Sequence, residues 1–492
     1  MIRHPLFLSI LLLFGCQSRA QIQSATPSFT ISVGAGLQAE VRPEGRLILK
    51  LRAEGGRTLA YGTQLKGLDR GPVTVKPTAD WVGNNDVALA DLPAGAYTVW
   101  AEFDQKEFGA ADGFPYVLKS AEKTVTFAPF KQANLSLTKA TRAPVFQETD
   151  LLKEFSFRSA ALSDFHGRDV TVKAAILLPA GYADNPGKRY PIRYNVAGYG
   201  GRYTRVQRIL GNESFMEWYT SGAGPQIISV YLDSDGPYGD NYQLNSANSG
   251  PFGDALIKEL IPQLEAKYRA LPGSDHRFVD GCSTGGWVSL ALQTFYPDVF
   301  GGCYSYSPDP VTFSRMQLIN LYEDPNAFFN ASGYERPSSR DIYGDPTLSI
   351  RQEVTDENVT APTGTYNTSR GQWGAWNALY SAKGEDGYPK PAFDPVTGKI
   401  DPTAVKHWRQ YDLLQYTKKN WTTLGPKLQG KVYVWMGDMD NYYLNNALRE
   451  YDAFLKTTSR PKSDAVIEFV PMEGHCSGYS GRRVLEQIMT RY

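Results

Sequence analysis

Six consecutive residues, Gly281 to Gly286, constrain the fold of this 492-residue chain more than any other segment. Their sequence, Gly-Cys-Ser-Thr-Gly-Gly, contains a G-x-S-x-G pattern with Ser283 at its apex. In this pattern a strand turns sharply into a helix, and the serine Oγ is exposed at the turn. Glycines flank the serine because a side chain there would collide with the turn. The pattern predicts a strand, Ser283 as a candidate nucleophile, and a helix, in that order.

Strands alternate with helices from about residue 150 to residue 492. An apolar helical pattern occupies residues 256–268, where Pro262 should introduce a kink. Such alternation predicts an α/β domain with a mostly parallel sheet covered on both faces. The expected strands of this sheet are residues 170–178, 192–196, 226–232, 431–436 and 465–470.

Two regions depart from this alternation. Residues 26–142 contain short period-two stretches between turn residues, which predicts an all-β, immunoglobulin-like sandwich domain. Residues 311–425 are rich in Tyr, Trp, Asn, Asp and Gly, and we interpret them as a lid-like insertion over the active-site mouth. Trp373 and Trp376 of this insertion are candidates for stacking on a sugar or a phenolic group, although aromatic residues in lids are often simply packed.

The N-terminus resembles an export signal. Arg3 and His4 precede an apolar run at residues 6–15, which is too short to span a bilayer comfortably. Residues 1–20 form the expected signal peptide. Alternatively, residues 1–15 are a lipoprotein signal and Cys16 is lipidated, which would be the only membrane attachment. The mature protein is then periplasmic, extracellular or an outer-membrane lipoprotein.

The overall charge argues against one class of partner. The chain has 51 basic and 51 acidic residues, and its net charge is zero. Because no run of Lys or Arg stands out, nucleic acid is not expected as a partner.

A serine nucleophile needs a general base, and an acid that orients this base. Of five histidines, His475 directly follows the last expected strand, where a loop can bring it over Ser283. His4 lies in the signal and His166 lies ahead of the sheet. His276 lies at the wrong end of the strand before Ser283, and His407 lies in the insertion. His475 is therefore the candidate base.

The acid should follow the strand at residues 431–436, because acid precedes histidine in the chain order serine, acid, histidine. Asp438 and Asp440 both lie there. Asp440 fits the usual placement better, whereas Asp438 almost abuts the strand and is suited to capping a turn. Asp309, which follows an earlier strand, is a more distant alternative.

An oxyanion hole needs two backbone N–H groups that point at the developing negative charge. Thr284, which follows the serine, supplies one. The glycine-rich turn at residues 198–201 is the expected source of the second, with the Tyr199 amide as the candidate. A serine, a histidine and a carboxylate require no metal and no organic cofactor.

These motifs resemble the putative-esterase branch of the α/β-hydrolases. Val196 to Gly201 stands where that branch shows His-Gly-x-Gly-Gly, with Ala197 in place of the histidine, and residues 249–254 are also similar. The resemblance implies an α/β-hydrolase fold and ester hydrolysis through an acyl-enzyme. The implied substrates are small esters or acylated glycans, from which feruloyl, acetyl or similar acyl groups are removed.

Five residues also match the CS-D-HC arrangement of tannases and fungal-type feruloyl esterases: Cys282, Ser283, Asp440, His475 and Cys476. In those enzymes a disulfide joins the two cysteines, which implies a bond between Cys282 and Cys476 here. Such a bond is feasible if Ser283 and His475 are within hydrogen-bond reach. The alternative is two reduced cysteines packed near the site. Cys303 is then left as a buried free thiol.

Two other functions use the same residues. A serine peptidase or an acyltransferase would share the proposed nucleophile, base and acid. A glycan-binding surface lipoprotein with a vestigial hydrolase domain is a third possibility. The complete set of serine, histidine and aspartate favours an enzyme.

Overall fold

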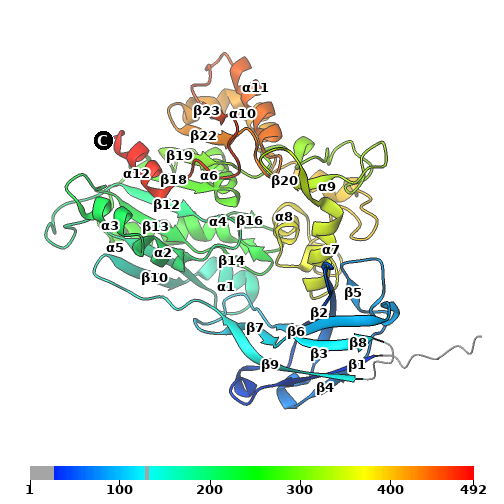
Figure 1. Ribbon diagram of the computed structural model, residues 1–492. Coiled ribbons are helices and arrows are strands. Elements are labelled where there is room, and N and C mark those ends of the chain that lie inside the picture. The colour runs from blue at the N-terminus through cyan, green and yellow to red at the C-terminus, as the bar shows by residue number, and fades with distance from the viewer. Residues whose placement is uncertain (1–26, 128–131) are drawn as a thin grey trace, which may run out of the picture.

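The computed structural model describes residues 27–127 and 132–492. The expected signal peptide and Cys16 lie outside the described residues. An all-β region at the N-terminal end lies against a larger α/β region that contains the C-terminus (Figure 1). None of the helices in the described part of the chain has the length and apolar character needed to cross a membrane.

The described part of the N-terminal region is all-β, as the period-two pattern predicted, and its nine strands form one connected sheet. Strand β6 pairs with β8 through its first half and with β7 through its second half, so both strands share one edge of β6. Alternate side chains of β2 and β6, among them Leu47, Leu49, Val99 and Phe103, belong to a core separate from that of the α/β region. The strands are β1 (Ser28–Val33), β2 (Glu44–Ala53), β3 (Thr58–Lys66), β4 (Val73–Val75), β5 (Val82–Gly83), β6 (Gly95–Asp104), β7 (Pro115–Ser120), β8 (Lys123–Phe127) and β9 (Gln132–Arg142).

The α/β region is organised around an eight-stranded sheet in the order β10-β11-β13-β12-β18-β19-β22-β23. The pairs β10–β11 and β11–β13 are antiparallel, and the others are parallel. This is the strand order of the α/β-hydrolase fold, so the predicted fold class is confirmed. The strands are β10 (Leu152–Arg158), β11 (Thr171–Leu177), β12 (Ile192–Val196), β13 (Ile228–Leu232), β18 (Arg277–Cys282), β19 (Gly302–Tyr306), β22 (Val432–Gly437) and β23 (Val466–Val470).

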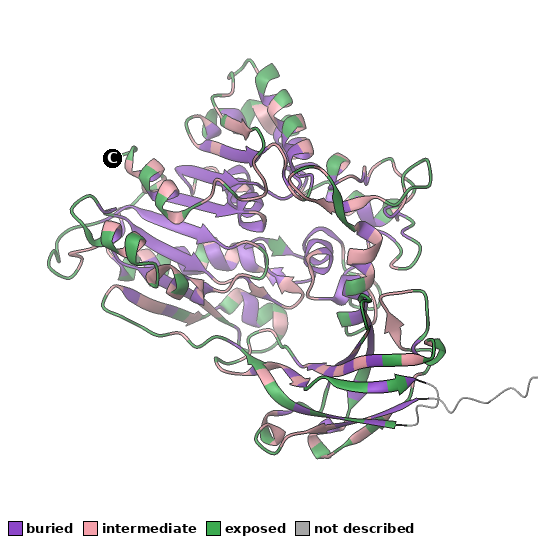
Figure 2. Ribbon diagram, in the orientation of Figure 1, coloured by how far each residue is buried: buried purple, intermediate pink, exposed green. Residues whose placement is uncertain are grey.

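Helices cover both faces of this sheet, whose central strands are buried throughout (Figure 2). Side chains of β11 alternate between two clusters, with Ala174 and Ile176 in one and Ala175 and Leu177 in the other, because successive residues of a strand point to opposite faces. On one face the cluster includes α5 (Ile261–Lys267), α6 (Thr284–Phe295), α10 (Leu413–Leu428) and α11 (Asn445–Thr457). On the other it includes α2 (Val206–Leu210), α3 (Glu213–Thr220) and α12 (Gly481–Met489).

The helix expected around Pro262 is not a single kinked helix. It consists of α4 (Phe252–Asp254), a π-helical turn at Ala255–Leu260, and α5. Pro262 is the second residue of α5 and directly follows the π-helical turn. The change of helix type thus accommodates the proline. Short elements nearby are α1 (Ala160–His166) and the hairpins β14 (Asp235–Gly236) with β15 (Gly239–Asp240), and β16 (Asn245–Ser246) with β17 (Gly250–Pro251).

The insertion after β19 is folded rather than irregular. It contains β20 (Pro337–Arg340), β21 (Pro346–Ser349), α7 (Ile350–Thr360), α8 (Gln372–Tyr380) and α9 (Pro402–Trp408). Helix α10 starts inside the expected range of 311–425, but it packs against α6, where the Tyr416 and Phe295 rings meet edge-on at 4.8 Å. The added segment therefore ends before Leu413.

Helix α7 connects the two regions. The Arg46 Nε of β2 donates to the Val359 carbonyl oxygen at 2.8 Å, and Ile48, Ala60 and Val359 form a small buried cluster. Figure 1 shows α7 between the N-terminal strands and α8. Glu353 and Glu357 of α7 line a cavity of the α/β region that Ser283 and His475 also line. The N-terminal region thus packs directly against an element of the cavity wall.

Candidate active site

Ser283 lies between β18 and α6 with φ 62° and ψ −126°, a conformation that L-residues rarely adopt. The residues two positions before and after it, Gly281 and Gly285, must be glycine for steric reasons. A Cβ on Gly285 would lie 2.3 Å from the Val196 carbonyl oxygen, and one on Gly281 would lie 2.5 Å from the Gly285 carbonyl carbon. Close approach of β12, β18 and α6 therefore fixes the predicted elbow.

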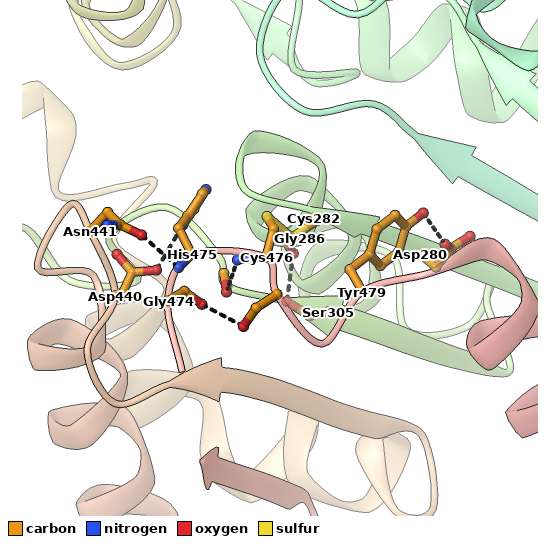
Figure 3. Close-up of a disulfide and its surroundings, with 12 residues drawn as sticks. Asp280, Cys282, Gly286, Ser305, Asp440, Asn441, Gly474, His475, Cys476 and Tyr479 are labelled. Carbon is orange, nitrogen blue, oxygen red and sulfur yellow. Dashed lines mark hydrogen bonds and ion pairs between the residues drawn. A yellow bond between two sulfur atoms is a disulfide. The ribbon is translucent and has the colours of Figure 1, made fainter. Parts of the chain in front are cut away.

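His475 and Asp440 form a hydrogen-bonded pair in the loops that follow β23 and β22 (Figure 3). The distance between His475 Nδ1 and Asp440 Oδ2 is 2.7 Å. Asp440 is fully buried, and its Oδ1 accepts from the Tyr442 amide at 2.9 Å. The His475 backbone N–H donates to Asn441 Oδ1 at 2.9 Å. With Nδ1 engaged, Nε2 is the ring nitrogen left for Ser283, and both residues line the same cavity.

The carboxylates around His475 make it more basic than an ordinary histidine. Burial lowers the pKa of His475, but the charge and hydrogen bond of Asp440, together with the charge of Asp309, outweigh burial and raise it above 6.5. A base with this pKa accepts a proton readily near neutral pH.

The alternative acid and the other histidines occupy different places. Asp438 forms an ion pair with Arg449 on α11, and its side chain is 37% exposed. Three histidines bind or stack elsewhere: His166 contacts the Ser249 carbonyl, His276 stacks on Tyr492, and His407 contacts the Tyr380 carbonyl. The structure thus pairs His475 with Asp440. Asp438 and the other three described histidines make their contacts elsewhere.

A disulfide joins Cys282 to Cys476, with a Cα–Cα distance of 6.0 Å (Figure 3). The Cys476 amide also donates to Ser307 Oγ, at the end of β19, at 3.1 Å. Cys303 on β19 is a buried free thiol, and burial raises its pKa to about 12. It is therefore unreactive at neutral pH.

The candidate oxyanion-hole amides lie on the two segments that border Ser283. Thr284 is the first residue of α6, where backbone N–H groups have no partner within the helix. The Tyr199 amide donates no hydrogen bond among residues 27–127 and 132–492. The preceding Gly198 lies against the elbow, because a Cβ placed on it would be 3.8 Å from the Ser283 Cβ. Both amides are thus free to bind an oxyanion.

Ser283 and His475 open into a cavity of about 1150 Å³. Trp376 lines this cavity, but only 3% of its surface is exposed. The prediction that Trp373 stacks on substrate is wrong. Its ring is fully buried, because it packs edge-on against Trp376 and Phe393 while its Nε1 donates to Glu353 at 3.2 Å.

Sequence reasoning missed Tyr442, whose ring packs edge-on against that of His475 at 4.9 Å and is 42% exposed. Asp309, the more distant alternative for the acid, is not hydrogen-bonded to His475. Three donors converge on Asp309 Oδ2: Tyr242 OH at 2.9 Å, Thr284 Oγ1 at 3.1 Å and Trp376 Nε1 at 3.0 Å. Asp309 therefore connects the elbow to the insertion.

The model of a family described as "Putative esterase" matches residues 166–387. Solved structures with a similar chain path include a ferulic acid esterase, which is 14% identical, with a TM-score of 0.44 over 69% of this chain and 97% of that chain. The fluorophosphonate-binding serine hydrolase F of Staphylococcus aureus is 12% identical, with a TM-score of 0.41 over 69% and 97%. An S-formylglutathione hydrolase from Agrobacterium tumefaciens is 13% identical, with a TM-score of 0.40 over 70% and 97%. No curated protein matches the chain.

Proposed function

We propose that the protein is a serine ester hydrolase whose catalytic triad is Ser283, His475 and Asp440, and the match of residues 166–387 to the model of the putative esterase family supports this function. The observation that carries the proposal is the 2.7 Å bond between His475 Nδ1 and Asp440 Oδ2 beside the serine elbow. This bond holds the tautomer that presents an unprotonated Nε2 to the serine hydroxyl.

The reaction follows from this arrangement. His475 Nε2 takes the Ser283 proton while Oγ attacks the ester carbonyl carbon, and the carbonyl electron pair moves onto its oxygen. The amides of Thr284 and Tyr199 bind this oxyanion. When the oxyanion collapses, the bond to the alcohol breaks, and His475 returns the proton to the leaving oxygen. Water, activated in the same way, then attacks the acyl-enzyme and releases the acid and free Ser283.

We further propose that the protein is exported and acts on acylated glycans or phenolic esters, removing feruloyl, acetyl or similar acyl groups. Two observations support this proposal. A disulfide, such as the Cys282–Cys476 bond beside the site, persists in oxidising compartments. The cavity of about 1150 Å³ is large enough for an acyl group together with part of its alcohol.

A fluorophosphonate probe tests the triad. It should label the wild-type protein, and Ser283→Ala should abolish both labelling and hydrolysis of p-nitrophenyl acetate. The matched control is Ser289→Ala, a buried serine on α6 whose hydroxyl bonds the Gly286 carbonyl. Labelling that persists in Ser283→Ala would refute the triad. Amide hydrolysis faster than ester hydrolysis would instead indicate a peptidase.

A further inference from the structure

A second groove of the α/β region lies apart from the active site. Its volume is about 1120 Å³, and no residue of the described chain lines both this groove and the cavity around Ser283. Helix α6 connects the two sites, because it begins at Thr284, directly after the nucleophile, and its last residue, Phe295, lines the groove. The 12 residues of this helix span about 18 Å, so the groove is remote from the reacting atoms.

Four positively charged side chains line this groove, which we call the basic groove; they are Lys406, Arg409, Lys418 and Lys419. All four are exposed, and none forms an ion pair with any residue that the structure describes. By contrast, Lys427, further along α10, binds Asp298. The Arg409 guanidinium lies 3.9 Å from the centre of the Tyr322 ring, a contact that orients a cation without neutralising it.

The positive charge of the groove has no carboxylate close by to balance it. Within residues 27–127 and 132–492, no Asp or Glu lines the groove. The Asp254 amide donates to Asn245, which lines the groove, but the Asp254 carboxylate is paired with Lys258. Asp412, the N-cap of α10, is fully buried and accepts from Thr312 Oγ1 at 2.9 Å. The groove is therefore basic on a chain whose net charge is zero.

Aromatic rings line the same groove. Four of them are partly buried: Phe295, Tyr296, Tyr411 and Tyr416. The Phe295 and Tyr416 rings meet edge-on at 4.8 Å, and Tyr411 OH donates to the Asn245 carbonyl at 2.9 Å. Rings held in this way keep a fixed orientation, and their exposed parts can stack on the apolar face of a sugar.

Side-chain amides complete the lining. They belong to Asn245, Gln410, Gln415 and Asn420. An amide both donates and accepts, as a sugar hydroxyl does. The groove thus combines cations for acidic groups, rings for sugar faces and amides for hydroxyls.

Two other polyanionic partners fit the groove less well. A lipid surface would contact exposed apolar side chains, but among the described residues none of the large exposed ones lines the groove. Proteins that bind nucleic acid commonly make about six to ten phosphate contacts, which is more than four cations supply.

We propose that the basic groove binds an anionic polysaccharide, with its cations on carboxylate or sulfate groups and its rings on sugar faces. The choice of a polysaccharide over another polyanion rests on the proposed function, whereas the preference for negative charge does not. A chain held in this groove keeps its ester groups at a raised local concentration near Ser283.

Binding of four polymers to the wild-type protein tests the inference. Polygalacturonate carries carboxylates, dextran sulfate carries sulfates, dextran is neutral, and single-stranded DNA is a polyanion of another class. At least one of the two anionic glycans should bind about tenfold or more tightly than dextran. Raising the salt concentration from about 0.05 to about 0.5 M should weaken this binding. The inference is overturned if neither anionic glycan binds more tightly than dextran, or if the DNA binds as tightly as the better glycan.

Variants locate the binding within the protein. The double variant Lys406→Gln, Lys419→Gln should raise the Kd of the preferred anionic glycan about tenfold, because two ion pairs are lost. The matched control is Lys399→Gln, Lys462→Gln, which removes two exposed lysines of the α/β region that do not line the groove. Urea midpoints check that both double variants are folded. An equal Kd in the two double variants would overturn the assignment to this groove.

These measurements separate the inference from the proposed function, because none of them requires turnover. If the protein binds an anionic glycan through the groove but Ser283 does not react with the fluorophosphonate probe, only the proposed function fails. If the protein hydrolyses esters but binds neither anionic glycan, only the basic groove is refuted.

Discussion

The disulfide between Cys282 and Cys476 joins the residue before Ser283 to the residue after His475, 194 positions apart in the sequence. The two residues come from β18 and from the loop after β23, and β19 and β22 lie between those strands in the sheet. The bond therefore fixes the base loop to the elbow across two intervening strands. Fixed geometry of this kind lowers the entropy cost of bringing reacting groups together.

Breaking this disulfide should reduce both stability and activity. In the chain-entropy model, a loop closed over 194 residues contributes about 5 kcal/mol to the free energy of unfolding. The double variant Cys282→Ser, Cys476→Ser should therefore unfold at a lower denaturant concentration. Its kcat should also fall in buffer without denaturant, because the His475 loop is no longer tied to the elbow.

Reductant provides the control for this prediction. Wild-type protein and Cys303→Ala should lose activity in parallel when the disulfide is reduced, since Cys303 is a free buried thiol. The double variant should not respond to reductant. Full activity after verified reduction would show that the disulfide does not position the base.

Replacing Asp440 should affect catalysis far more than replacing Asp438. Asp440→Asn removes the charge that faces His475 Nδ1 and favours the wrong tautomer, so kcat should fall about 10³- to 10⁴-fold. Asp438→Asn breaks a surface ion pair with Arg449, which contributes about 1 kcal/mol or less. Steady-state kinetics of the two variants decides between them, and equal losses would contradict the assignment.

The raised pKa of His475 sets the acidic limb of the pH profile. The base must be unprotonated, so kcat/KM should rise with pH and have its midpoint above 6.5, the ordinary value for histidine. Asp309→Asn should move this midpoint to lower pH, because it removes one of the negative charges that raise the pKa of His475. An unchanged midpoint in this variant would show that Asp309 does not act on the base.

The same shift has a consequence for stability, with the opposite dependence on pH. A group whose pKa is higher in the folded state binds its proton more tightly there. The stabilisation by protonated His475 is fully present below the unfolded-state pKa of about 6.5 and is lost as pH rises through the higher folded-state value. His475→Gln should therefore reduce the free energy of unfolding more at pH 5 than at pH 9, measured by urea titration.

Short local patterns predicted the elbow, the sheet and the pairing of His475 with Asp440, because each depends on residues that directly follow a strand. Contacts between distant segments could not be predicted in this way. The peptide Ser307-Pro308-Asp309-Pro310 gives no sign that Asp309 accepts bonds from Tyr242, Thr284 and Trp376. Likewise, the spacing of Trp373 and Trp376 does not show which ring faces the cavity, since that depends on how α8 packs in the insertion.

The contact between the N-terminal strands and α7 was also invisible in the sequence, and it leads to a further prediction. A Cβ on Gly62 of β3 would lie 2.0 Å from the Val359 carbonyl oxygen of α7. Gly62→Val should therefore push α7 away and cost about 1–3 kcal/mol in the free energy of unfolding. Because α7 carries Glu353 and Glu357 in the cavity wall, KM should rise more than kcat falls.

Gly36→Val is the matched control, because a Cβ on Gly36 meets no atom within 4 Å. It lies in the same N-terminal region and should leave KM and the urea midpoint unchanged. Should Gly62→Val fail to fold, Gly62→Ala introduces a smaller clash and should give the same KM effect with a smaller loss of stability. If folded Gly62 variants have the KM of Gly36→Val, the N-terminal region does not position α7, and its packing against the cavity wall has no part in substrate binding.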